Sequence, residues 1–186
     1  MFELPPIPTW DSLHPLIIHF PIALLFLCPL FIGLSAVLTP PKGRPFLIAA
    51  LIVLLLGTAS LFIAASTGKA AGELADRGGP VDSVLASHED LASETRLIFS
   101  GLSAILLGMF FLPRILRRQE TRIFSTVLPL AFLVLYSVGI LFLVNTSHKG
   151  GLLVHEFGVH ALPPDARSQP EARSVAADTV MNENKD

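Results

Sequence analysis

Four long runs of apolar residues, separated by short polar segments, dominate the pattern along this chain. The runs cover residues 16–38, 46–66, 97–112 and 127–144. A helix needs roughly 20 residues to cross a hydrocarbon layer of about 30 Å, and the third run is short by itself. We extend that run backwards through "VLASHEDLASETR" to a helix that begins near Ser83 and is capped by Asp82. The pattern therefore predicts four membrane-spanning helices.

These helices define an all-α fold, an integral membrane four-helix bundle. We expect the helices at about 13–38, 45–77, 83–113 and 124–149, within a single domain of residues 13–161. Residues 1–12 read as an extended segment. Residues 162–186 are polar, contain proline and lack periodicity, so we expect a disordered tail.

Composition agrees with a membrane protein. Of the 186 residues, 52% are hydrophobic and only 15% are charged, and the mean hydropathy is +0.64. Cys28 is the only cysteine, which excludes an intramolecular disulfide and a CxxCH haem attachment. The sequence contains no glycine-rich phosphate loop and no nucleophile–base motif. These absences argue against a soluble-type enzyme, and the apolar composition makes the lipid bilayer, and no nucleic acid, the expected partner.

Charge distribution predicts the orientation. Basic residues concentrate in two short loops, which hold six of the thirteen lysines and arginines: Lys42, Arg44, Arg114, Arg117, Arg118 and Arg122. Short loops rich in Lys and Arg stay in the cytoplasm. We therefore predict a protein of the cytoplasmic membrane, with these two loops in the cytoplasm and both termini on the outer side.

With that topology, all six histidines fall at the outer end of the bundle: His14, His19, His88, His148, His155 and His160. The first four occupy one broad layer near the membrane boundary, where a polar side chain normally faces the bundle interior or a cavity. Neutral imidazole ligates transition metals and haem iron. The alternative is that these imidazoles only form hydrogen bonds between packed helices. For His155 and His160, which follow the glycines, we expect solvated side chains.

The spacing of the first two histidines leaves their convergence open. Five residues of ideal helix rotate a side chain by about 140°, so His14 and His19 would not share a face. Pro15 suits a first helical position, which leaves the direction of His14 unconstrained. Pro21 would free the carbonyl of Ile17, and a kink there could aim His19 inward.

Two further features concern packing and charge. Ala64, Gly68 and Gly72 recur every four residues as a small-residue seam that allows close helix approach. Arg96 lies at the start of the third apolar run, where its guanidinium could meet a haem propionate or an acidic lipid headgroup. A snorkelling side chain is the alternative reading for Arg96.

The stretches "LHPLIIHFPIALL", "SHEDLA" and "SHKGGLLVHEFGV" resemble motifs of a family of bacterial membrane proteins, domain of unknown function 2231. The resemblance covers about residues 12–161. It implies a four-helix fold and a shared histidine set that corresponds to His14, His19, His88 and His148. His155 stands where the family has Tyr, and His160 where it has Gly. Association of family members with cytochrome c proteins implies redox work and such a partner, or the subunits of a membrane redox complex.

Three functions compete. The first is an electron-transfer subunit that binds haem b, with His14, His19, His88 and His148 as the ligand pool and Arg96 as a propionate partner; bis-histidine ligation needs imidazoles from facing helices at similar height. The second is a non-haem Cu or Zn site built from the same four histidines. The third is a structural accessory subunit of a larger respiratory or photosynthetic complex.

Overall fold

The computed structural model describes residues 8–38, 41–75, 78–115 and 123–159, which are helical apart from turns and short connections. The elements in chain order are α1 (His14–Ile17), α2 (His19–Val37), α3 (Arg44–Glu73), α4 (Pro80–Ile115), the π-helical turn η1 (Ile123–Val127) and α5 (Leu128–His155). The tail expected over 162–186, and His160, lie outside the described residues.

Four spans in this part of the chain are long and apolar enough to cross a membrane. They cover His14–Val37, Arg44–Glu73, Pro80–Phe111 and Ser125–His155. Large apolar side chains point outward from them, including Val37, Leu97 and Val134, which are 80%, 75% and 73% exposed. Such a surface suits lipid and not water. The prediction of an all-helical bundle with four transmembrane helices is confirmed.

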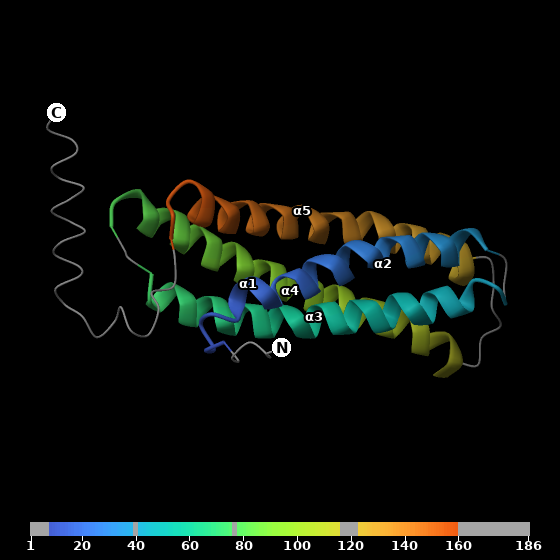
Figure 1. Cartoon of the computed structure of the whole chain (residues 1–186). Coiled ribbons are helices and arrows are strands. Elements are labelled where there is room, and N and C mark those ends of the chain that lie inside the picture. Colours follow the sequence, from blue (N-terminus) through green and yellow to red (C-terminus); the bar gives the residue numbers. More distant parts are fainter. Residues whose placement is uncertain (1–7, 39–40, 76–77, 116–122, 160–186) are drawn as a thin grey trace, which may run out of the picture.

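The four long helices form a ring in which neighbours in the chain are neighbours in space. Helix α2 packs against α3 and α5, and α4 packs against the same two helices. The pairs α2/α4 and α3/α5 therefore occupy the two diagonals, and Figure 1 shows α5 and α3 along opposite edges of the bundle. Because α1 continues into α2, it brings the N-terminal histidine to the corner diagonal to α4.

The interior combines an apolar core with a few hydrogen bonds between helices. Tyr136 is fully buried and packs edge-on against Phe99, with 5.5 Å between ring centroids. Thr58 on α3 and Ser103 on α4 form a buried hydroxyl pair at 3.0 Å. Because lipid offers no hydrogen-bonding partners, such pairs hold membrane helices together.

The N-terminal span begins with a turn over residues 10–13 and not with extended chain. One helical hydrogen bond is missing between α1 and α2, because Pro21 has no N–H to bond the carbonyl of Ile17. The backbone of Ile18 stays helical, so the span continues from His14 to Val37 as expected. His14 is the first residue of α1, with Pro15 directly after it.

The other helix ends also differ from the expected bounds. Helix α3 ends at Glu73, and α4 begins at Pro80 and not near Ser83, so Asp82 lies in the first turn and is not its cap. Proline suits that first position because the N–H it lacks would have no helical partner. Helix α5 continues through its two glycines to His155.

Candidate functional site

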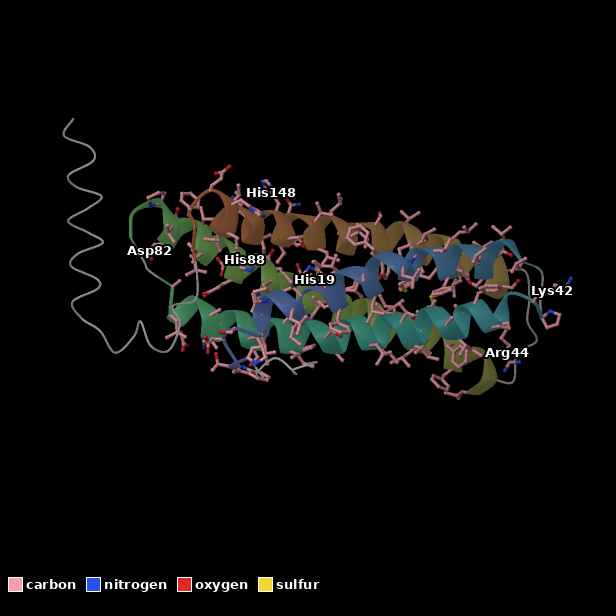
Figure 2. The ribbon with its side chains drawn as sticks, in the orientation of Figure 1. His19, Lys42, Arg44, Asp82, His88 and His148 are labelled. Atoms are coloured by element: carbon pink, nitrogen blue, oxygen red, sulfur yellow. The ribbon has the colours of Figure 1, made fainter. Side chains whose placement is uncertain are left out.

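The candidate site lies at the end of the bundle that holds His14 and His88, which we call the histidine end. Figure 2 places His88, His148 and Asp82 towards this end, and Lys42 and Arg44 at the opposite end. His19 lies further along the bundle in the direction of Lys42. The structure therefore has Lys42 and Arg44 at the end opposite to His88 and His148, as the sequence predicts.

His14 is half-buried against helix α3. Its Nδ1 lies 2.9 Å from the carbonyl oxygen of Ala64 and 3.2 Å from the hydroxyl of Thr67. A carbonyl only accepts, so Nδ1 carries the proton and donates it. Beneath the ring is Gly68, where an added Cβ would lie 2.7 Å from Cε1 of His14. The ring fits because this position of α3 has no side chain.

His88 makes the equivalent contact between α4 and α5. Its Nδ1 lies 3.0 Å from the carbonyl oxygen of Thr146, so it too donates its proton to a helix backbone. Gly150 leaves room for the ring, since an added Cβ there would lie 3.1 Å from Cε1 of His88. The hydroxyl of Thr146 pairs with that of buried Thr95 at 2.8 Å, which ties α4 to α5 beside the imidazole.

The two imidazoles share one chemical state. With Nδ1 protonated, a neutral ring keeps its lone pair on Nε2, the nitrogen that remains able to bind a metal or accept a proton. His14 and His88 come from diagonally opposed corners of the bundle, and both lie towards the end where α3 meets α4. The sequence placed both residues in one layer, and in the structure each donates Nδ1–H to a helix backbone there.

The remaining histidines do not join the pair. His19 and His148 are exposed, and so is His155 in the last turn of α5, where we expected a solvated side chain. Pro21 does not turn His19 inward, because the side chain of His19 is exposed. Among the described residues, no group of three or more His, Cys, Asp and Glu side chains is placed to hold a metal ion.

Arg96 lies further along α4 than His88, next to the lipid-facing part of the helix. Its guanidinium carbon is 5.8 Å from the ring centroid of Phe62 on α3. Its Nε is buried and finds no hydrogen-bond acceptor among the residues that the structure describes.

Sequence reasoning missed the residues that orient the two imidazoles. Thr146 and Gly150 received no role, and Ala64 and Gly68 were assigned to helix packing alone. The packing role is confirmed, because an added Cβ at Gly72 would also meet Glu89 and Leu85 of α4. The sequence did carry a signal for these contacts. The stretches "ASTGKAAG" and "SHKGG" contain Gly68 and Gly150, and each glycine lies at the same level of the bundle as one of the two imidazoles.

Comparison with known proteins gives one informative match. A family model described as a predicted membrane protein (DUF2231) matches residues 11–163. No curated protein and no solved structure matches the chain.

Proposed function

The chain belongs to this family of predicted membrane proteins, and from that premise we propose an electron-transfer protein that holds haem b between His14 and His88. The observation that carries the proposal is the matched state of the two rings. Each donates Nδ1–H to a backbone carbonyl, 2.9 Å away for His14 and 3.0 Å for His88. That state leaves Nε2 unprotonated on both, so that each ring would be able to hold a haem iron.

The donor set fits haem better than a zinc or copper site. A closed zinc site takes four protein ligands, and a catalytic one takes three. The described residues contain no group of that size. Bis-histidine haem needs only two imidazoles from facing helices, and His14 on α1 and His88 on α4 are the pair that we propose for it. A Cu or Zn site at this pair would need ligands from outside the described residues.

The residues of the chain have separable tasks in this proposal. His14 and His88 would hold the iron, and haem would supply reversible one-electron transfer. The carbonyls of Ala64 and Thr146 fix the ring tautomers and make the imidazoles more basic. Gly68 and Gly150 let the rings lie against the backbones of α3 and α5. His19 and His148, which are exposed, have no such orienting contact among the described residues and serve as comparison positions.

Location and partners follow from the charge distribution. We place the protein in the bacterial inner membrane with the histidine end and both termini in the periplasm, because Lys42 and Arg44 lie at the opposite end. An electron carrier at the periplasmic surface needs a partner there. A cytochrome c or a subunit of a membrane redox complex is the partner we propose.

The test is an absorption spectrum of protein purified in detergent from cells with ample haem. A Soret band is expected for the unaltered chain. His14→Ala and His88→Ala should each lose haem or change its spin state, because one remaining ligand leaves iron five-coordinate. His19→Ala and His148→Ala should keep the spectrum. A haem-free chain with full haem supply would overturn the proposal.

One observation favours a second function, a structural accessory subunit. The bonds from His14 to α3 and from His88 to α5 join helices whether or not a cofactor is present. In that case the histidine variants would weaken the fold without any spectral change. Metal analysis of the same sample would separate this outcome from copper or zinc binding.

A further inference from the structure

We propose that Arg96 and Phe62 form a binding site for the phosphate group of a phospholipid in the leaflet at the histidine end. The site uses no part of the histidine pair and does not depend on the proposed haem. It rests on the position of Arg96, on its unmatched donor and on the surface around it.

Arg96 lies where the polar part of α4 meets its apolar part. Leu97 begins the long apolar run of this helix, and His88 precedes Arg96 by eight residues. At a rise of 1.5 Å per residue, Arg96 is therefore about 12 Å closer to the membrane centre than His88. Arg96 therefore stands below the histidine layer, at the start of the apolar part of α4, from where a long side chain can extend towards the lipid phosphates.

The guanidinium has one buried donor that no described residue satisfies. Its Nε is buried, and no acceptor within the described residues takes its proton. An unpaired donor in such surroundings is costly, and a charged one more so. Arg presents a planar fork of N–H donors that matches the oxygens of a phosphate. An anion of this shape would satisfy the group that the protein leaves unmatched.

The surroundings open towards lipid. Phe62, which lies 5.8 Å from the guanidinium carbon, is 52% exposed, and Leu97 is 75% exposed. Phe62 holds the guanidinium by a cation–π contact. The residues around the charge are therefore those that acyl chains would cover, which favours an anion that arrives attached to a lipid.

A haem propionate is the competing anion. A group held between His14 and His88 would reach Arg96 only by directing its carboxylates towards the middle of the membrane. Soluble phosphate would have to pass the exposed carboxylates at this end of the bundle, including Glu89, Asp90 and Glu94. Both competitors are outcomes of the experiment.

The experiment is native mass spectrometry of the full chain in detergent, titrated with phosphatidylglycerol or with diacylglycerol of the same acyl chains. The unaltered chain should bind phosphatidylglycerol, and diacylglycerol much more weakly. Arg96→Gln should weaken phosphatidylglycerol binding about tenfold, because it removes a charge-assisted hydrogen bond. The matched control is Lys69→Gln, which removes an exposed cation of α3 near the same end and should change binding less than about twofold.

Two further variants keep the test decisive if Arg96→Gln does not fold. Arg96→Lys keeps the charge and loses the planar fork of donors. Its binding of phosphatidylglycerol should therefore lie between that of the unaltered chain and that of Arg96→Gln. Phe62→Leu keeps an apolar surface and loses the ring face, so binding should fall by a few fold. Equal binding by all variants, or by both lipids, would overturn the proposal. So would displacement of the lipid by millimolar inorganic phosphate or by haem.

Discussion

The hydroxyl of Tyr136 on α5 donates a hydrogen bond of 2.8 Å to the backbone carbonyl of Leu25 on α2. Four residues later in α2 comes Pro29, which has no N–H and so cannot bond that carbonyl within the helix. Both Tyr136 and Leu25 are fully buried. In a membrane interior, where water cannot take its place, a side chain from a neighbouring helix replaces the missing backbone donor.

The first prediction concerns this bond. Tyr136→Phe should lower the free energy of unfolding by about 1 to 3 kcal/mol, because it leaves a buried carbonyl without a donor. Pro29→Ala restores an N–H four residues after Leu25, so Tyr136→Phe should cost less in that background. Unfolding in mixed micelles gives the free energy of unfolding of the unaltered chain, the two single variants and the double variant. An equal cost in both backgrounds would show that the proline is not the reason for the bond.

The second prediction concerns the glycine beneath His14. Gly68→Ala should destabilise the fold by about 1 to 3 kcal/mol, since the added methyl group would displace the imidazole from Ala64. Gly150→Ala should have a smaller effect, because its contact with His88 is longer. Gly101→Ala is the control: no atom lies within 4 Å of an added Cβ there, so the helix should be unchanged or gain up to about 1 kcal/mol. Thermal unfolding in detergent ranks the three, and a harmless Gly68→Ala would contradict the packing described.

The third prediction concerns the ring protons. Nitrogen-15 NMR of the chain labelled at histidine should find Nδ1 protonated and Nε2 unprotonated in His14 and His88, because carbonyl oxygens face Nδ1 of both. The exposed ring of His19 should instead exchange between tautomers. Assignment uses His14→Ala and His88→Ala. An Nε2–H form at either ring would remove the main support for axial ligation.

The fourth prediction concerns sidedness. Lys42 and Asp82 are exposed at opposite ends of the bundle. In intact cells, an impermeant maleimide should label Asp82→Cys and leave Lys42→Cys unlabelled until the membrane is opened. The native Cys28 is fully buried and gives little background. The cysteine is placed at Lys42 and not at the neighbouring Gly43, because a side chain added at Gly43 would collide with the Ser35 carbonyl. The reverse labelling pattern would place the histidine end in the cytoplasm.

Hydrophobic patterning was enough to predict the four helices and to put His14 and His88 towards the same end of the bundle. It could not select the pair His14 and His88, because the direction of each ring depends on which neighbouring helix supplies a carbonyl and a glycine. Residues 14 and 64, and residues 88 and 146, are brought together only when the bundle packs. The length of α5 could not be predicted for the same reason. The low helix propensity of glycine would end the helix near Gly150, but packing of this stretch against His88 stabilises it and α5 continues to His155.

The absence of a side chain under each imidazole also restricts how this sequence can change over generations. A chain that keeps His14 should keep glycine at 68, since even alanine would place a methyl group 2.7 Å from Cε1 of the ring. A chain that loses His14 is released from that restriction and is free to fill the space with alanine or serine. The same argument couples His88 to Gly150. In related sequences, each histidine and its glycine should therefore change together, and the histidine should be replaced before its glycine.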